Sequence, residues 1–376
     1  MMHQTEFPPD LLTQPSAVRL KYFEGKVITH PHLKETYQQL WQAIQRPTGA
    51  SLIFVYGPTG VGKTTLRYRL EQRLWEAGQS VAEQNPGHIP VAGVEVAVAD
   101  ADSFRWRDYY KRALTALDEP MIDHKTMPKH IRQKEIAPKW EKGYKVTSDL
   151  RWALEQTLIH RQPAAFIVDE AQHFKRITSG RRLLDQMDTI KSLANLSGIT
   201  HVLIGTYELL SFAHLSAQLD RRSCEIHFPR YHVDTTEEML AFKRILLTFQ
   251  SHLPLKDEPD LVTQAEYFYE RSVGCVGVLK DWLTRSLAET LEDGQETLTK
   301  ATLERQALPT RKLLRMAREI REGEETLIAD SRAQSELRSL LGIPVESTQN
   351  HSSNSSRKVG KRNPVRDLVG NHEQVT

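Results

Sequence analysis

The chain has 376 residues, of which 39% are apolar, and its formal net charge is +2. This composition is enough for one large or two modest domains with a sizeable core, and the presence of only two cysteines, Cys224 and Cys275, excludes a disulfide framework. No stretch approaches the length of a membrane span, and residues 1–6 lack the apolar core of a signal peptide. We therefore expect a cytoplasmic protein without a membrane partner.

The N-terminal part of the chain leads to one apolar strand. Residues 1–30 are expected to be irregular because they contain three prolines, and residues 32–46 follow helical spacing. The apolar run 52–56 is expected to form a strand. Directly after it comes a complete G-x-x-x-x-G-K-[ST] loop with one further threonine, formed by Gly57, Pro58, Thr59, Gly60, Val61, Gly62, Lys63, Thr64 and Thr65.

This loop has the residue types of a phosphate-binding site. Its glycines allow successive backbone N–H groups to turn toward a triphosphate, and the helix expected after it presents its positive N-terminal end. Lys63 adds a positive charge, and the Thr64 hydroxyl can coordinate Mg²⁺. The order of strand, loop and helix therefore predicts binding of a nucleoside triphosphate. We expect that helix to end near Gly78.

Three further elements are expected before the next motif. Residues 91–99 are rich in valine and are expected to form a buried strand, and residues 105–117 follow a helical pattern. Residues 118–147 contain three prolines and are expected to be a loop or short-helix insertion. Ser148 or Asp149 is expected to cap the helix that follows.

An apolar strand at residues 166–169 ends in two adjacent carboxylates. Asp169 can hold Mg²⁺ through water, and Glu170 can polarise an attacking water, so the pair predicts nucleotide hydrolysis. The alternative is a chance match of the loop and an ordinary helix cap at the two acids. The eight matched loop residues, both strand contexts and the 105-residue gap between Lys63 and Val168 favour hydrolysis. That gap leaves room for the intervening strand and helices of a nucleotide-hydrolysing α/β core.

The chain becomes increasingly helical after the acidic strand. A helix is expected at residues 180–196 and a strand at 201–206, and the pattern is helical from 234 to 308. The last 30 residues are polar and carry a basic cluster at 357–362, so we expect a disordered tail. Such a tail can fold on a partner, contact DNA or have no role.

This order of elements resembles that of an AAA+ ATPase, and further residues fall where that family carries functional groups. Thr206 closes the strand after the acidic one, at the place of a polar sensor of the γ-phosphate. Arg221 and Arg222 fall at the place of an arginine finger. Lys280 lies in a run, 274–280, that looks like the second sensor motif of the lid, where the family often has arginine. The resemblance implies ATP and Mg²⁺ as cofactors and a finger that acts in trans, so that hydrolysis depends on oligomerisation.

Each of these positions also has a plainer interpretation. Thr206 can be an ordinary strand end, the paired arginines a surface salt-bridge site, and Lys280 an exposed position on a lid helix. For the arginines we favour function, because an isolated site lacks a charge that stabilises the developing γ-phosphate and a neighbouring subunit can supply it.

Within AAA+ proteins the chain most resembles the TnsC/TniB regulators of DNA transposition, over about residues 20–300. The Asp-Glu-Ala-Gln-His run at 169–173 and the Gln-Leu-Asp-Arg-Arg run at 218–222 are the most specific parts. The resemblance implies an ATP-dependent homo-oligomer, a ring or a filament, that wraps duplex DNA. It also implies placement by a target-selection protein of the TniQ or TnsD type and recruitment of a transposase, and some relatives belong to CRISPR-associated transposons. The alternatives are an initiator-type or helicase-loading AAA+ ATPase and a STAND-like signalling ATPase.

A basic excess provides an independent basis for the DNA partner. Residues 105–145 contain 11 Lys or Arg against 6 Asp or Glu. In an oligomer around DNA each subunit needs only one or two phosphate contacts, which position the protein without reading sequence. The alternative is a solvated helix face and loop. The natural donors are Arg105, Arg107, Lys111, Lys139, Lys142 and Lys145.

These patterns together predict an α/β fold, namely an AAA+ P-loop core with a parallel sheet, a small helical lid and a disordered C-terminal tail. We expect an irregular segment at 1–30, the nucleotide-binding core at 31–232 with its insertion at about 118–147, the lid at 233–310, a helical extension at 311–345 and the basic tail at 346–376.

Overall fold

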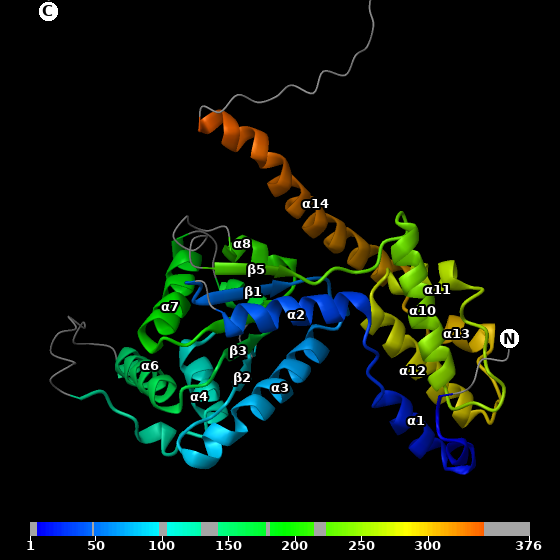
Figure 1. Ribbon diagram of the computed structural model, residues 1–376, viewed down its shortest axis with the longest axis horizontal. Coiled ribbons are helices and arrows are strands. Elements are labelled where there is room, and N and C mark those ends of the chain that lie inside the picture. The colour runs from blue at the N-terminus through cyan, green and yellow to red at the C-terminus, as the bar shows by residue number, and fades with distance from the viewer. Residues whose placement is uncertain are drawn as a thin grey trace, which may run out of the picture. The chain divides into compact units, whose positions relative to one another are not determined.

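A computed structural model describes residues 6–46, 49–97, 104–128, 142–177, 181–213 and 223–341 of the chain (Figure 1). The chain divides into two compact units, Met1–Glu325 and Thr326–Thr376. The first unit contains a five-stranded sheet with its surrounding helices and a separate group of helices. The second begins within the long helix α14 (Thr310–Leu340).

The sheet is parallel throughout, and its strands lie in the order β2-β3-β4-β1-β5. The expected strands form, although β2 is shorter than predicted. The strands are β1 (Leu52–Tyr56), β2 (Ala92–Glu95), β3 (Phe166–Asp169), β4 (His201–Gly205) and β5 (Ser223–His227). Tyr56 at the end of β1 pairs with Gly205 of β4 and with His227 of β5. Because the strands run in one direction, their carboxyl ends meet at one edge of the sheet.

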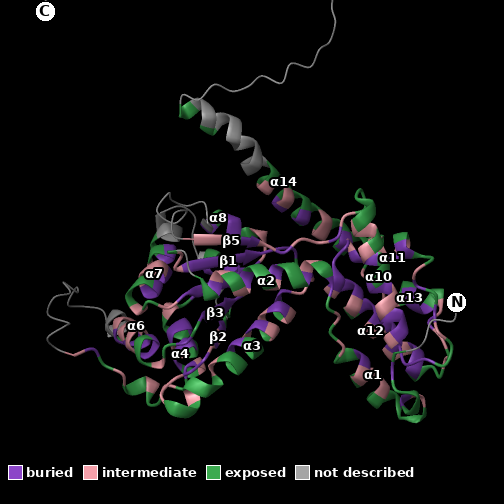
Figure 2. Cartoon of the chain, viewed as in Figure 1, coloured by how far each residue is buried: buried purple, intermediate pink, exposed green. Residues whose placement is uncertain are grey.

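Helices cover both faces of the sheet. On one face lie α2 (Pro31–Gln45) and α3 (Lys63–Gln84). Their apolar residues recur at helical intervals, as Leu66, Leu70 and Leu74 do in α3, and they pack against side chains of β1, β3, β4 and β5. All five residues of β1 are buried, so the opposite face is covered as well. In Figure 2 β1 is drawn as buried, whereas β5 is drawn mainly as intermediate.

The remaining elements around the sheet follow the same α/β order. Helices α4 (Trp106–Ala116) and α6 (Lys142–Arg161) pack against each other, and α4 also contacts β2. The others are α7 (Arg181–Ser197), α8 (Leu210–Ala213) and the short 3-10 helices η1 (Pro9–Thr13), η2 (Ile122–His124), η3 (Ala171–Ile177) and η4 (Tyr207–Leu209).

A second hydrophobic core belongs to the helices that follow the sheet, which we call the lid. These are α10 (Thr236–His252), α11 (Ala265–Ser272), α12 (Val276–Glu292) and α13 (Lys300–Gln306). Trp282 and Phe249 are buried in this core together with Phe23, which comes from α1 (Ser16–Glu24). The N-terminal segment is therefore part of the lid packing.

Several boundaries differ from the sequence predictions. Residues 1–30 are not wholly irregular, because α1 forms directly after Pro15. Helix α3 continues past Gly78, where the missing side chain allows Pro90 to approach; a Cβ there would lie 2.6 Å from the Pro90 Cβ atom. Helix α6 begins at Lys142, so Asp149 is an interior residue, and its Oδ1 accepts a hydrogen bond from Met127 N at 2.9 Å.

No helix in the described ranges combines the length and the apolar character that a membrane span requires.

Candidate functional site

The loop after β1 has the backbone of a phosphate cradle. Gly60 and Gly62 have φ angles of +78° and +113°, which side chains other than glycine rarely adopt. A Cβ at Gly57 would lie 2.2 Å from the carbonyl oxygen of Phe228, so the space there also requires glycine. Helix α3 begins at Lys63. The loop therefore places its N–H groups at the positive end of a helix of 22 residues.

Lys63 is held inside this loop. It is only 8% exposed, and its Nζ donates to Gly57 O at 3.0 Å and to Pro58 O at 2.8 Å. Burial lowers the pKa of Lys63 to about 8, against the opposing effect of the carboxylates of Glu170 and Asp169. A buried ammonium group with carbonyl partners is a favourable contact for an incoming phosphate anion.

The two predicted acids have different surroundings at the end of β3. Asp169 is buried, its Oδ2 accepts from Arg67 Nη1 at 3.3 Å, and its Oδ1 accepts from Glu170 N at 2.9 Å. Glu170 has a φ angle of +52°, and its Oε2 lies 3.8 Å from His173 Nε2. Arg67 comes from the second turn of α3, and no sequence motif indicates that it is a partner of Asp169. The pairing fixes Asp169 next to the phosphate loop.

Thr206 lies beside the loop, as its predicted role requires. Gly57 N donates to Gly205 O at 3.3 Å, so the end of β4 adjoins the start of the loop. The Thr206 Oγ1 atom is buried and has no hydrogen-bond partner among the described residues. Its backbone N–H donates to Gln172 Oε1 at 3.2 Å. The structure therefore brings the loop, the acid pair and Thr206 together at one edge of the sheet.

The lid contacts the phosphate loop through the start of α12. Gly277 N and Val278 N donate to Gly60 O at 2.7 and 3.3 Å. A Cβ at Gly277 would lie 2.5 Å from Gly60 O, and a Cβ at Gly60 would lie 2.5 Å from Val278 Cγ2. Two glycines thus permit the closest approach between lid and loop, and a nucleotide in the loop would lie next to the lid.

Lys280 does not point to the phosphate loop, in contrast to its predicted role as a second sensor. Its Nζ donates to Phe23 O and lies 3.6 Å from the Phe23 ring centroid. Burial lowers the pKa of Lys280 to about 8. The physical reason is that the C-terminal turn of α1 offers a carbonyl oxygen and an aromatic face, which both attract a cation. Because α1 was not predicted, this competing partner was not foreseen.

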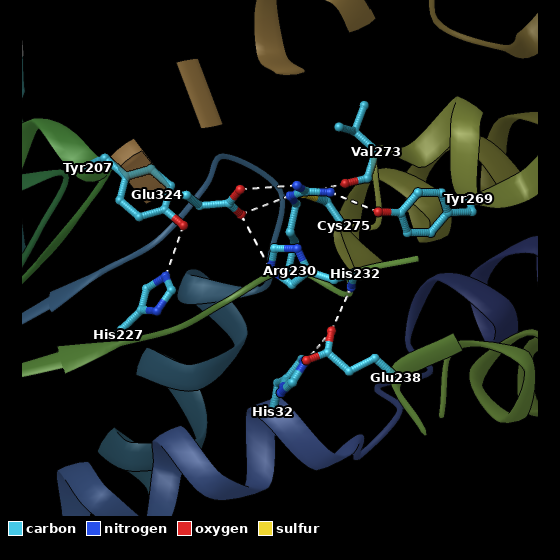
Figure 3. A network of polar contacts seen from close by, with 10 residues as sticks. All are labelled: His32, Tyr207, His227, Arg230, His232, Glu238, Tyr269, Val273, Cys275 and Glu324. Carbon is cyan, nitrogen blue, oxygen red and sulfur yellow. Dashed lines mark hydrogen bonds and ion pairs between the residues drawn. The ribbon is translucent and has the colours of Figure 1, made fainter. Parts of the chain in front are cut away.

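A polar network joins the sheet edge, the lid and α14 (Figure 3). Arg230 lies in the segment between β5 and α10, and it donates from Nε to Glu324 Oε1 at 2.9 Å and from Nη2 to Glu324 Oε2 at 3.0 Å. Its Nη1 donates to Tyr269 OH at 2.8 Å. Beside this pair, Tyr207 OH lies 2.9 Å from His227 Nε2. No sequence motif contains Arg230 or Glu324, because 94 positions separate the two residues.

The predicted arginine finger lies outside the described residues. Arg221 and Arg222 directly precede β5, whose first residue is Ser223. Lys139 also lies outside the described ranges. Lys142 and Lys145 are on the first turns of α6, where only the backbone is described. The roles of these residues remain predictions.

The other predicted DNA contacts lie at or near the start of α4. Arg105 and Arg107 are exposed, and Lys111 is half-buried and forms an ion pair with Asp123. The two exposed arginines can therefore reach the phosphate backbone of DNA, whereas Lys111 can do so only if its ion pair with Asp123 breaks.

The residues of the site fit a triphosphate and Mg²⁺. Thr64 is exposed in the first turn of α3, the buried Thr206 hydroxyl lacks a partner in the described structure, and Lys63 provides a buried ammonium group. Among the described residues no group of three or more His, Cys, Asp or Glu could hold a metal by itself. This donor set suits Mg²⁺, which takes one or two protein ligands and completes its shell with phosphate oxygens and water.

Comparison with known proteins agrees with this geometry. Residues 44–212 match the family described as AAA domain. None of the curated proteins matches the sequence. The solved Aeropyrum pernix ORC1 protein in complex with DNA is similar with a TM-score of 0.52 at 16% identity, covering 78% of this chain and 68% of that chain. The Aeropyrum pernix ORC2 protein in its ADPNP and ADP complexes gives a TM-score of 0.49 at 17% identity, covering 77% and 71%. Residues 44–212 are thus similar to an AAA domain, and the chain has the AAA+ P-loop fold.

Proposed function

We propose that the chain is a regulatory AAA+ ATPase that oligomerises on duplex DNA and links a target-selection protein of the TniQ or TnsD type to a transposase. The single observation that carries the hydrolytic part is the convergence of the phosphate loop, the Asp169–Glu170 pair and Thr206 at one sheet edge. The core is assigned to residues 31–232 and the lid to residues 233–310, with α1 packed against the lid.

Each residue of the site has a different role in the proposed hydrolysis of ATP. ATP supplies the phosphoanhydride bond, and Mg²⁺ neutralises phosphate charge when both are bound. The loop N–H groups and Lys63 would bind phosphate oxygens, while Thr64 and Asp169 would hold the metal. Glu170 accepts the proton of the attacking water, and the Thr206 hydroxyl orients the reacting group. Arg67 restrains Asp169 through their ion pair.

The DNA and transposition parts of the proposal rest on separate observations. The exposed Arg105 and Arg107 near the start of α4 can contact phosphates without reading sequence. The ORC1 protein that shares the fold was solved in complex with DNA. The runs at 169–173 and 218–222 resemble those of the TnsC/TniB regulators. Each subunit then contributes one or two phosphate contacts, and repetition in the oligomer multiplies them.

A second candidate is an initiator-type or helicase-loading ATPase, and the fold shared with the DNA-bound ORC1 protein favours it. An initiator prefers one DNA sequence, and a loader binds a helicase. A STAND-like signalling ATPase assembles without DNA. The transposition regulator differs from all three because it requires DNA, accepts any sequence and engages a transposase.

The decisive experiment images the protein with unrelated duplexes and a non-hydrolysable ATP analogue. Rings or filaments should form on every duplex, and only with nucleotide. Glu170→Gln should form persistent assemblies with ATP itself, since binding survives and cleavage stops, whereas Lys63→Ala should form none. Assemblies of the same kind without DNA would contradict the proposal, and so would a Glu170→Gln protein that hydrolyses ATP at the parent rate.

The link to transposition needs its own measurement. The transposase and the TniQ- or TnsD-type protein encoded in the same genome should each bind the DNA-loaded oligomer, and strand transfer into a target should require this protein with ATP. Binding to a replicative helicase with no effect on strand transfer would support the second candidate instead.

A further inference from the structure

A buried glutamine connects the two catalytic positions of the proposed ATPase. Gln172 lies in η3 and is only 6% exposed. Its Nε2 donates to Glu170 Oε2, and its Oε1 accepts from Thr206 N at 3.2 Å. One side chain therefore contacts the carboxylate that would activate water and the backbone of the residue that would sense the γ-phosphate.

The local backbone is built around this side chain. A Cβ at Gly205 would lie 2.3 Å from Gln172 Oε1, so only glycine at the end of β4 leaves room for the amide to reach Thr206 N. Glu170 itself has a φ angle of +52°, a conformation that costs energy for a residue with a side chain. His173 N donates to Glu170 O at 3.0 Å and closes this turn.

The chemistry of the two contacts requires a primary amide. A carboxylate can only accept, so the group on Glu170 must be a donor; a backbone N–H can only donate, so the group on Thr206 must be an acceptor. Glutamine offers both at the ends of one planar group. Glutamate at position 172 would keep the acceptor and place a second negative charge against Glu170.

We propose that Gln172 is a positioning residue that sets the orientation of the Glu170 carboxylate and couples it to the strand end that carries Thr206. This inference rests on the proposed ATPase function. A displacement of Thr206 on contact with the γ-phosphate is then transmitted to Glu170 through one rigid amide, so that the base is aligned when the triphosphate is present. Gln172 touches neither phosphate nor metal in this role.

The test compares Gln172→Leu and the nearly isosteric Gln172→Glu with the parent protein. Both variants should bind ATP with unchanged affinity, measured with a fluorescent analogue, while kcat falls about 10- to 100-fold, the loss expected for one hydrogen bond to a charged group. In the Glu170→Gln background the substitution Gln172→Leu should have no further effect on residual hydrolysis, because the two residues act as one unit. A purely structural role predicts equal losses in both backgrounds.

The lid offers a matched control. Gln250 is also 6% exposed, donates to Glu258 Oε1 at 2.9 Å and accepts from Leu261 N at 2.9 Å. Gln250→Leu should lower thermal stability and leave kcat within about twofold of the parent. A parent-like kcat for both Gln172 variants, in a protein that does hydrolyse ATP, would overturn the inference alone. A parent protein without ATPase activity would overturn the proposed function and this inference together.

Discussion

Arg230 and Glu324 form a two-pronged ion pair, with N–O distances of 2.9 and 3.0 Å, although 94 positions separate them in the chain. Both side chains are largely buried, being 17% and 16% exposed. Gly323 directly precedes Glu324, and a Cβ at Gly323 would lie 2.2 Å from Tyr207 Cγ. Helix α14 therefore also packs tightly against Tyr207, the residue that follows Thr206. The first half of α14 therefore belongs to the first unit, and it contacts both the segment before the lid and the start of η4.

Removing the Glu324 carboxylate should abolish its ion pair with Arg230, which we call the α14 clamp. Glu324→Ala leaves the largely buried Arg230 guanidinium without its carboxylate partner. We therefore expect the free energy of unfolding to fall by about 1–3 kcal/mol. Hydrogen exchange of the amides in 310–325 should accelerate. The control is Glu325→Ala on the same helix, because Glu325 is 58% exposed and pairs with an arginine that is 79% exposed. That change should stay within about 0.5 kcal/mol. Equal effects of the two substitutions would mean that the clamp contributes no stability.

Motifs that depend on local chemistry could be predicted from the sequence. The phosphate loop has a fixed spacing and needs glycines at positive φ. The first three residues of the strand that ends at Asp169 are apolar because helices cover both faces. The AAA+ P-loop fold follows from that order and is confirmed. Thr206 lies beside the loop in the structure, and its role as a sensor stays a prediction.

Long-range polar contacts could not be predicted in this way. No local pattern links Arg67 to Asp169, Gln172 to Thr206 or Arg230 to Glu324, since each of these pairings depends on which elements the fold brings together. Strand β5 could not be predicted because it lacks an apolar run. It is an outermost strand of the sheet, and only Ile226 of its five residues is buried. The resemblance of residues 274–280 to a second sensor motif places Lys280 at the nucleotide, and its contact with Phe23 could not be foreseen because residues 1–30 were expected to be irregular.

Nucleotide affinity should depend on pH through Lys63. Burial lowers the pKa of Lys63 to about 8, so the free protein carries this charge below that pH and loses it above. Bound phosphate favours the ammonium form; ATP affinity should therefore be constant near pH 7 and weaken above pH 8, by at most about tenfold per pH unit. Equilibrium titrations between about pH 7 and pH 9.5 measure this. Lys63→Arg keeps its charge throughout and should show no such decline. A flat wild-type profile would mean that Lys63 stays protonated in the free protein.

The arginine pair before β5 should act between subunits. Arg221→Ala/Arg222→Ala protein and Glu170→Gln protein should each be nearly inactive in ATP hydrolysis. Mixed on DNA, they should recover part of the parent rate, because a subunit with an intact Glu170 is completed by a neighbour with intact arginines. Co-assembly is verified with two fluorescent labels. Confirmed mixed oligomers without recovered hydrolysis would exclude action in trans.

The DNA footprint can be tested at residues that the structure places at the surface. Arg105→Ala/Arg107→Ala should weaken binding to unrelated duplexes about equally and reduce the salt dependence of binding, because each lost phosphate contact releases about one counterion fewer. ATP binding should persist, since neither residue contacts the phosphate loop in the structure. The triple replacement of Lys139, Lys142 and Lys145 by alanine should add to the effect if those side chains share the same footprint.

A matched control separates a local footprint from a change in net charge. Lys243→Ala/Arg244→Ala removes two exposed positive charges from α10 in the lid, the same number as the Arg105 and Arg107 pair. Non-specific attraction by total charge predicts equal losses of DNA affinity for both double variants. A footprint at α4 predicts a loss, together with a smaller salt slope, only for Arg105→Ala/Arg107→Ala. If that variant instead keeps the parent affinity and salt slope, the basic excess at residues 105–145 is a solvated surface and DNA contacts another part of the oligomer.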